Sequence, residues 1–344
     1  MAIASRKRIR LNLALQGGGA HGAFTWGVLD QLLGDDRVKI ACIGAASAGA
    51  VNAVAVASGM AAAGPEGARD KLRRVWEAIH KAGVPEFQRF APLFPGLYGI
   101  DHLATSSYRQ LSNVFSPYSL NPLGFNPLGS ILAREIDFAL IRRQPPFPLL
   151  IAATNALTGQ ARFFRSHEVS VETVLASACL PTLHQAVEID GVPYWDGGFS
   201  ANPDLVQLAD GKSAGDTLVV LLNPIRLEEV PTTAAMIANN VSRLTFNQPF
   251  LRDVAILDGV RRACGPLKGG GHRLKRLRRQ RFHLIEAGAY TSQLAPDSKM
   301  KPEWRLLSHL HQAGFDEAEQ WSARHLRDIG RRETANLPKL FLDN

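Results

Sequence analysis

A serine within a run of small residues is the strongest candidate for chemistry in this sequence. Ser47 lies in the stretch Ala45-Ala46-Ser47-Ala48-Gly49, after the apolar run 38–43 and before a small-residue helical segment that starts at residue 50. A serine at a sharp turn from strand to helix needs small neighbours because the backbone is crowded there. The pattern predicts a nucleophile elbow, with the helix directing partial positive charge at the serine oxygen. Ala45 replaces the first glycine of the usual GxSxG pattern, and its single extra methyl group is compatible with this turn.

A run of glycines upstream offers backbone N–H donors. Gly17, Gly18 and Gly19 follow the apolar run 11–15 and precede an amphipathic segment, 23–33. Together with Gly22 they also satisfy the GxGxxG pattern of dinucleotide-binding folds. Such a site needs an acidic residue at the end of the second strand, where this sequence has small residues instead. We therefore predict no dinucleotide cofactor, and an oxyanion hole formed by the three glycine amides.

The nucleophile needs a base, and Asp196 is the best candidate. None of the ten histidines lies in a glycine turn at the end of a predicted strand, whereas Asp196 ends the short run 192–196 and precedes Gly197-Gly198. An isolated Asp-Gly-Gly sequence is most often an ordinary turn. Combined with the elbow and the glycine loop, it predicts that Ser47 and Asp196 form a catalytic pair that uses no metal and no cofactor.

Strands and helices alternate along the chain around these residues. Further strands are expected at 149–153, 161–164, 187–189 and 218–222, and further helices at 72–79 and 131–142. This alternation predicts a layered α/β sheet. In the C-terminal part, helices are expected at 236–245 and 250–262, followed by a helical hairpin of 304–311 and 316–329 that is broken at Gly314.

The chain divides into three parts by these patterns. We expect a basic N-terminal segment (1–10), a catalytic domain (11–224) and a mainly helical C-terminal extension (225–344) packed on the sheet. Residues 85–129 are rich in Pro, Gly, Ser and aromatic side chains, and a connection of this length usually covers something. We interpret it as an insertion or lid over an acyl chain, with an ordinary satellite core as the alternative.

Composition limits the class of protein. With 344 residues, 46% hydrophobic and 20% charged, the chain can bury a sizeable core, which excludes wholesale disorder. No apolar run approaches the length of a membrane span or matches a signal peptide, so a cytoplasmic location is the default expectation. Cys42, Cys179 and Cys264 are far apart and show no metal-ligand spacing, which argues against a disulfide framework or a zinc site.

The net charge of +8 is concentrated in one segment. Residues 261–281 contain nine Lys or Arg and no Asp or Glu. One interpretation is contact with an anionic membrane surface. Lipid headgroups are favoured over nucleic acid because no aromatic residue interleaves the basic ones before Phe282. The other interpretation is a solvated loop around the three glycines 269–271, and both remain open at this point.

Taken together, the motifs resemble the patatin-like phospholipase family. Residues 17–22 match its oxyanion loop, 45–49 its elbow and Asp196-Gly197-Gly198 its acidic motif. Ala176-Ser177-Ala178-Cys179-Leu180-Pro181 resembles the segment that precedes this acidic motif. The resemblance covers about residues 11–205. It implies a three-layer α/β/α sandwich with a mostly parallel sheet, and hydrolysis of acyl esters by a Ser/Asp dyad without metal.

Similarity through 116–128, 153–155 and the C-terminal hairpin indicates the bacterial branch with an added C-terminal domain of unknown function. His21 stands where many members have Arg or Lys; it either alters the charge near the glycine loop or simply begins the following helix. We expect a phospholipase A-like lipid acyl hydrolase. The alternatives are a hydrolase of another ester, such as a storage polyester or an acyl thioester, and a non-catalytic lipid-surface protein that works through 261–281.

Overall fold

An eight-stranded sheet organises the chain. The computed structural model describes residues 8–83, 116–211, 213–227, 229–263, 271–295 and 297–343. The strands are β1 (Ile9–Leu15), β2 (Val38–Ala45), β3 (Leu149–Asn155), β4 (Ala161–Arg165), β5 (Val187–Ile189), β6 (Val192–Asp196), β7 (Asp216–Leu221) and β8 (Arg281–Glu286). Hydrogen bonds link neighbouring strands along the path β5-β6-β3-β2-β1-β7-β8, and β4 also pairs with β3. Strands β3, β2, β1, β7 and β8 are parallel neighbours, and β4, β5 and β6 pair in antiparallel fashion.

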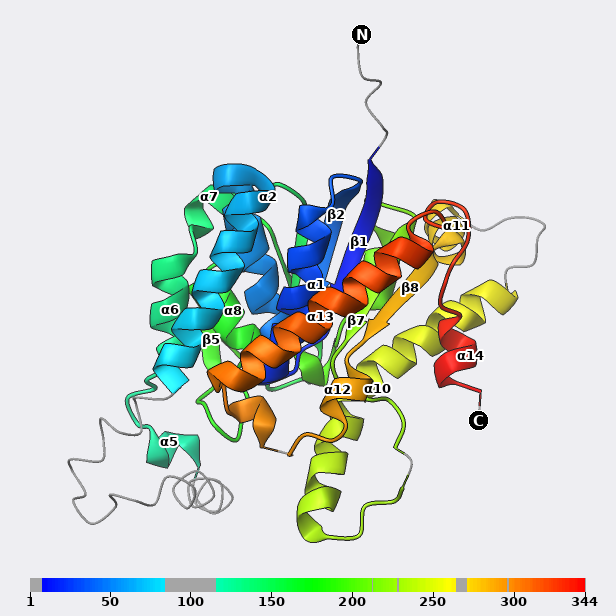
Figure 1. The fold of residues 1–344 in the computed structure, drawn as a ribbon. Helices are drawn as coiled ribbons and strands as arrows, with labels where there is room; N and C mark the ends of the chain where they lie inside the picture. The colour runs from blue at the N-terminus through cyan, green and yellow to red at the C-terminus, as the bar shows by residue number, and fades with distance from the viewer. Residues whose placement is uncertain are drawn as a thin grey trace.

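Helices cover both faces of this sheet (Figure 1). They are α1 (Gly22–Gly34), α2 (Ala48–Gly83), α5 (Pro117–Leu120), α6 (Pro127–Glu135), α7 (Phe138–Arg143), α8 (Val171–Ser177), α9 (Leu205–Asp210), α10 (Ala234–Ala263), α11 (His272–Arg279), α12 (Gly288–Thr291), α13 (Trp304–His325) and α14 (Leu337–Phe341). Three short 3-10 turns are η1 (Gly19–His21), η4 (Gly197–Phe199) and η5 (Ser298–Met300).

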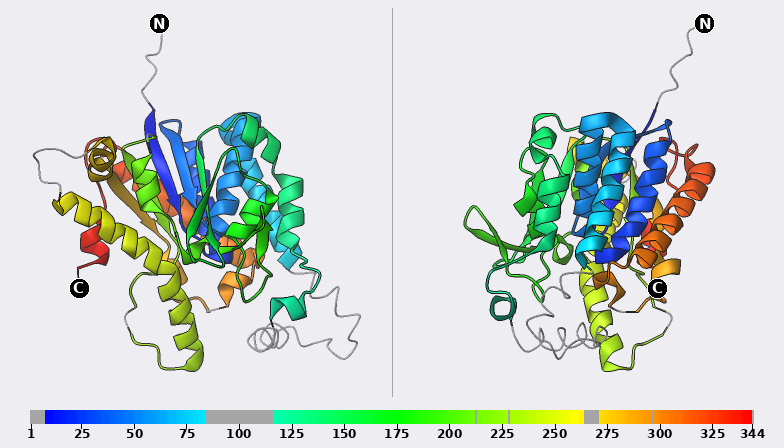
Figure 2. Two further views of the ribbon diagram at one scale, coloured as in Figure 1. Left: turned by 180° about the vertical axis from the view of Figure 1, so that it is seen from behind. Right: turned by 60° about the vertical axis from the view of Figure 1, so that its left-hand side comes forward.

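The central strands divide their side chains between two cores. Leu11, Leu13 and Leu15 of β1 belong to a core shared with α1, α2 and α13, whereas Ala14 belongs to one shared with α9, α10 and α14. Alternate residues of a strand point to opposite faces, so a strand buried on both sides reads as a continuous apolar run. Figure 2 shows the second helical layer from behind, with α10 running across the sheet. The predicted three-layer α/β/α architecture is therefore confirmed.

Helix α2 connects the elbow to the helical layer. It starts directly after Ser47 and is kinked at Ala63 and Gly64, just before Pro65, where the backbone leaves the helical region. Among the described residues, α2 is the one helix long and apolar enough to cross a membrane by length and composition. However, 67% of its most apolar window is buried inside the fold. We therefore interpret α2 as a core helix.

The predicted hairpin near Gly314 is wrong, because residues 304–325 form the single helix α13. Gly314 serves a close crossing of helices instead of a turn. A Cβ atom there would lie 2.0 Å from the backbone oxygen of Phe24, and one at Gly27 would lie 1.9 Å from that of His311. Both contacts are far below the separation that real side chains tolerate, so two glycines allow α1 and α13 to approach at backbone contact.

The C-terminal extension is less separate than its helical pattern indicates. Strand β8 extends the sheet by pairing in parallel with β7, in register from Asp216 with Arg281 to Leu221 with Glu286. The charged residues at both ends shorten its apolar run, and this hides it in the sequence. The helices expected at 236–245 and 250–262 form one element, α10, with Pro249 inside it. Of the predicted lid, residues 85–115 lie outside the described residues.

Candidate active site

Ser47 occupies the sharp turn between β2 and α2. Its φ angle is +53°, a left-handed conformation that residues other than glycine rarely adopt. Its backbone N–H donates to Oγ of Ser177, at the end of α8, over 2.9 Å. Two residues later, a Cβ atom at Gly49 would lie 2.5 Å from the backbone oxygen of Leu15. The strained turn is therefore held by a hydrogen bond to α8, and the small residues of the motif allow β1 to pass close by.

Strand β3 explains how Asp196 reaches this turn from far along the chain. Strand β4 pairs with residues 150–154 of β3, and this ladder overlaps both the β2 ladder (149–151) and the β6 ladder (153–155). Because two strands cannot pair with the same residues from the same side, β2 and β6 share the side of β3 opposite β4. Strand β2 runs parallel to β3 and β6 runs antiparallel to it, so the carboxyl ends of β2 and β6 meet. Those ends carry Ser47 and Asp196.

The Asp196 carboxyl group is completely buried in a network of fixed hydrogen bonds. Its Oδ1 accepts a hydrogen bond from the backbone N–H of Gly198 over 2.7 Å, and its own backbone N–H donates to the carbonyl of Cys179 over 2.8 Å. Its carbonyl accepts a hydrogen bond from Oγ1 of Thr154. A Cβ atom at Gly197 would lie 2.1 Å from the backbone oxygen of Ala152. The Asp-Gly-Gly turn thus requires glycine for a close contact with β3.

Burial raises the pKa of Asp196 to about 7, because removal from water disfavours the carboxylate. Hydrogen bonding by the Gly198 amide and by the Ser47 hydroxyl opposes this rise. Among the described residues, Oδ2 has no partner at good hydrogen-bond geometry, so the Ser47 contact is long or poorly aligned. In free enzymes such contacts commonly tighten only when substrate binds.

The glycine loop after β1 lies against the elbow. A Cβ atom at Gly17 would lie 2.7 Å from Cβ of Ser47, and Gly19 has a φ angle of +58°. The N–H of Gly17 donates to Oδ1 of Asn202 over 2.8 Å. This amide holds the loop in place and is not free for an oxyanion, in contrast to the prediction. Within the described part of the chain, the amides of Gly18 and Gly19 have no acceptor, and neither has that of Ala48.

An apolar cavity of about 270 Å³ opens beside Ser47. Its walls come from α2, α6 and the segment around η5, and they include Val51, Trp76, Ile79, Leu128, Ile131 and Met300. Gly19 and Ser47 lie on its polar side. An acyl chain that enters this cavity would therefore bring its carbonyl group between the nucleophile and the glycine loop.

Sequence reasoning missed the residues that hold this site together. Ser177 appears in the sequence only within the segment that resembles the family, and Asn202 carries no recognisable signal.

Lys299 lines the cavity, and its pKa is lowered to about 8 by burial and by the nearby Arg243. His21 is buried, its Nε2 lies 2.7 Å from Oγ of Ser298, and burial lowers its pKa to about 3. It is therefore neutral, so it brings no positive charge to the loop.

Metal ligands are not gathered at this site. Within the described residues, no group of three His, Cys, Asp or Glu side chains is placed to hold a metal ion.

The model of the patatin-like phospholipase family matches residues 13–210. The chain therefore belongs to this family. The match contains the glycine loop, the elbow and the Asp-Gly-Gly turn, and membership indicates a hydrolase of lipid esters in general terms. A search of curated proteins finds no match. Among solved structures, the crystal structure of VipD from Legionella pneumophila is similar, with a TM-score of 0.41 and 14% identity over 92% of this chain and 67% of that chain.

Proposed function

We propose that this patatin-like protein hydrolyses acyl esters of lipids through an acyl-enzyme on Ser47, with Asp196 as the base. One observation carries the proposal: Ser47, on its strained turn, lines an apolar cavity and lies beside the buried carboxyl group of Asp196. Backbone strain at a buried turn is characteristic of functional sites. A carboxyl group with a perturbed pKa beside a hydroxyl group in a cavity is the expected pattern of a nucleophile and its base.

In the first half of the reaction, the Asp196 carboxylate accepts the Ser47 hydroxyl proton as Oγ bonds to the ester carbonyl carbon. The carbonyl oxygen becomes negatively charged in the tetrahedral intermediate. The amides of Gly18 and Gly19, aided by that of Ala48, donate hydrogen bonds to it. Each such donor typically lowers the barrier by about 3 kcal/mol. The carbon–oxygen bond to the alcohol then breaks, and protonated Asp196 returns its proton to the leaving alkoxide.

In the second half, Asp196 takes a proton from water as the water oxygen attacks the acyl-serine. The second tetrahedral intermediate uses the same amide donors, and its collapse releases the fatty acid while Ser47 regains its proton from Asp196. A base with a pKa near 7 suits both directions of transfer, since it is partly ionised at neutral pH and a competent acid once protonated.

The cavity supports an acyl substrate. Aliphatic and aromatic side chains dominate its walls, and its volume of about 270 Å³ lies at the small end of ligand sites. It therefore fits the part of one acyl chain nearest the ester, with the rest of the lipid outside.

The test compares Ser47→Ala with Ser130→Ala, an exposed serine on α6 that lies outside this cavity. Release of fatty acid from mixed phospholipid micelles and from acyl p-nitrophenyl esters is measured for both. We expect Ser47→Ala to lose activity by about 10³-fold or more, with Ser130→Ala close to the parent protein. Equal release by the two variants would contradict the proposal.

A further inference from the structure

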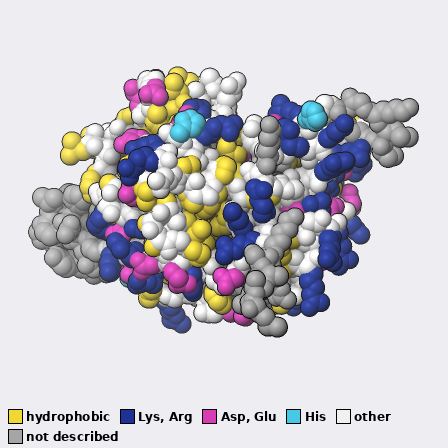
Figure 3. All heavy atoms as spheres, turned by 90° about the horizontal axis from the view of Figure 1, so that it is seen from above, with side chains coloured by type: hydrophobic (Ala, Val, Ile, Leu, Met, Phe, Trp, Pro, Cys, Tyr) yellow, Lys and Arg dark blue, Asp and Glu magenta, His cyan; other side chains and the backbone are white. Residues whose placement is uncertain are grey.

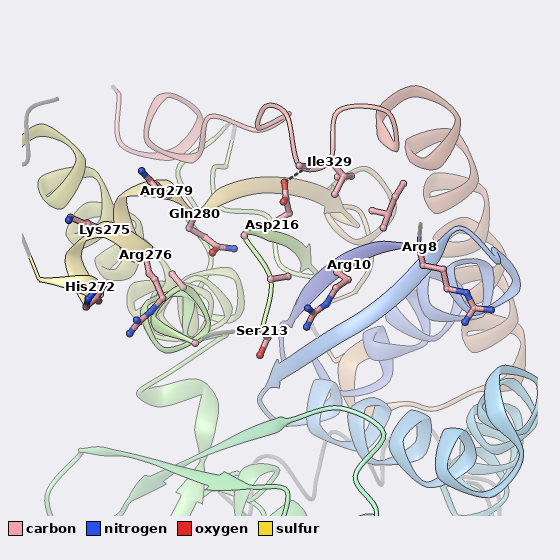
Figure 4. Close-up of a pocket in the computed structure, with 16 residues that line it drawn as sticks. Arg8, Arg10, Ser213, Asp216, His272, Lys275, Arg276, Arg279, Gln280 and Ile329 are labelled. Carbon is pink, nitrogen blue, oxygen red and sulfur yellow. Dashed lines mark hydrogen bonds between the residues drawn. The ribbon is translucent and has the colours of Figure 1, made fainter. Parts of the chain in front are cut away.

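A second and larger cavity lies at the opposite end of the sheet from Ser47. Its volume is about 1070 Å³, and we call it the basic cleft. It is bordered by the starts of β1 and β7, the loop before β7, and α11 (Figure 4). Parallel strands place their amino ends at one edge and their carboxyl ends at the other. The basic cleft therefore opens at the amino edge, whereas the glycine loop and the elbow follow the carboxyl ends of β1 and β2.

Of the residues that the structure describes, five with cationic side chains line the basic cleft, and they come from segments far apart in the sequence. Arg8 and Arg10 stand at the start of β1, and Lys275, Arg276 and Arg279 belong to α11. Figure 4 shows the two groups on either side of the cavity. Figure 3 looks onto this end of the molecule and shows Lys and Arg side chains gathered on it.

Most of this charge is uncompensated. Arg276 is paired with Asp210, outside the cleft, over 2.7 Å. Among the described residues, the one acidic side chain in the wall is Asp216, which already pairs with Arg281 over 2.7 Å and accepts a hydrogen bond from the backbone N–H of Gly330. The Arg281 contact and the other hydrogen bonds hold the pKa of Asp216 well below its usual range.

The remaining four cations, Arg8, Arg10, Lys275 and Arg279, have no ion pair or hydrogen-bond partner among the described residues. Like charges held around a concave surface concentrate positive potential and attract a multivalent anion. The folded chain thus places these four cations around one cavity, where no described acidic side chain pairs with them.

The hydrogen-bond donors in the walls indicate what kind of anion fits. Alongside the cations, the wall contains Ser213 and Gln280, and none of its described residues is Phe, Tyr or Trp. Arginine pairs well with phosphate oxygens because its guanidinium group donates two parallel hydrogen bonds. Nucleobases and single-stranded nucleic acids are typically held by stacking on aromatic rings, which this wall lacks. The chemistry favours phosphate groups themselves.

The position of the basic cleft argues against a membrane surface as its occupant. A strand of seven residues such as β1 spans about 23 Å, with Arg8 and Arg10 near one end and Gly17 beyond the other. A bilayer pressed against the cleft would face away from Ser47, and an enzyme that takes lipid from that bilayer needs its nucleophile towards it. A ligand dissolved in water carries no such constraint.

We propose that the basic cleft binds a soluble compound with several phosphate groups, at a site separate from the ester-hydrolysing one. The cations of β1 and α11 contact the phosphate oxygens from two sides. This assignment concerns binding alone and stands whether or not Ser47 acts as a nucleophile. It replaces the membrane interpretation of residues 261–281 for the part of that segment that forms α11.

The experiment titrates the full chain with inorganic tripolyphosphate by isothermal calorimetry in 150 mM salt. The test variant combines Arg10→Ala, Lys275→Ala and Arg279→Ala. The control, Arg143→Ala combined with Arg305→Ala and Lys339→Ala, removes the same charge from exposed sites outside the cleft wall. We expect one tripolyphosphate per chain, binding at least about tenfold weaker in the test variant, and near-parental binding in the control. Circular dichroism and the thermal transition of each variant establish that it is folded.

Two outcomes would overturn the proposal. One is equal weakening in the test and control variants, since it would mean that only net charge matters. The other is failure of tripolyphosphate to bind while vesicles of phosphatidylglycerol and phosphatidylcholine pellet the parent protein and not the test variant. That result would assign the same cations to a membrane surface.

Discussion

Replacing Asp196 by asparagine should stabilise the fold at high pH while it abolishes catalysis. Burial raises the pKa of this carboxyl group from an ordinary value of 3.8 to about 7. A shift of roughly three units corresponds to about 4 kcal/mol. The folded state binds the proton more tightly than the unfolded state, so its free energy of unfolding falls as pH rises from about 4 to about 7 and then levels off. The amide of asparagine does not ionise and escapes this loss.

The stability advantage of Asp196→Asn should therefore depend on pH. It should be near zero at pH 4 and grow towards about 4 kcal/mol at pH 8. Urea unfolding followed by circular dichroism at several pH values measures it. Asp190→Asn is the matched control, because Asp190 is exposed in the turn between β5 and β6 and its backbone, with a φ angle of +52°, also suits asparagine. This control should change stability little at any pH.

Activity should show the complementary behaviour. In the parent protein kcat/KM should rise as pH increases through about 7, because only the carboxylate can accept the Ser47 proton. Asp196→Asn should remain inactive across this range while the Asp190 control follows the parent profile. A stability difference between Asp196→Asn and the parent protein that stays constant from pH 4 to pH 8 would refute the reasoning. The buried carboxyl group would then not carry the energy assigned to it.

Three further predictions concern the surroundings of the site. Ser177→Ala removes the acceptor of the Ser47 backbone N–H, so kcat should fall by about tenfold, equivalent to about 1.4 kcal/mol, with little change in KM. An unchanged kcat in steady-state kinetics would contradict this role. Gly314→Ala should destabilise the α1–α13 crossing by about 3 kcal/mol or more. At Gly259 an added Cβ would have no atom within 4 Å, so Gly259→Ala should stabilise α10 by about 0.5–1 kcal/mol. Chemical unfolding that ranks the two variants the other way would disprove the crossing argument. Ile79→Trp should fill the apolar cavity and shift hydrolysis towards short acyl esters, and an unaltered chain-length profile would separate this cavity from the substrate.

The motifs of the site were predictable because each is short and contiguous in the sequence. The small residues around Ser47 and the glycines after β1 and β6 meet steric demands of segments that approach from elsewhere in the chain. Those demands appear in the structure as the close contacts of Gly17, Gly49 and Gly197. The alternation of strands and helices likewise predicts the layered sheet, because the hydrophobic pattern of each strand or helix lies within its own segment of the sequence.

Partners that come from distant segments were not predictable in the same way. Asn202 accepts a hydrogen bond from the backbone N–H of Gly17, 185 residues away in the sequence, and no motif near either residue indicates this contact. In the sequence alone, Gly314 indicates a break between two helices. Its actual role, to let α13 approach the backbone of α1, depends on a contact that the sequence does not show. Strand β8 has too short an apolar run to stand out, yet β7 supplies the edge on which it pairs. The basic cleft likewise depends on β1 and α11 meeting in space.

Labelling by a fluorophosphonate probe, with the modified residue located by tandem mass spectrometry, tests the central claim most directly. The probe reacts with serines that are activated as nucleophiles. We predict that Ser47 carries the label in the parent protein and that Asp196→Asn, with its folding verified by circular dichroism, labels far more slowly. Modification of a different serine, or equal labelling of Ser47 in the two proteins, would contradict the assignment of these residues as nucleophile and base.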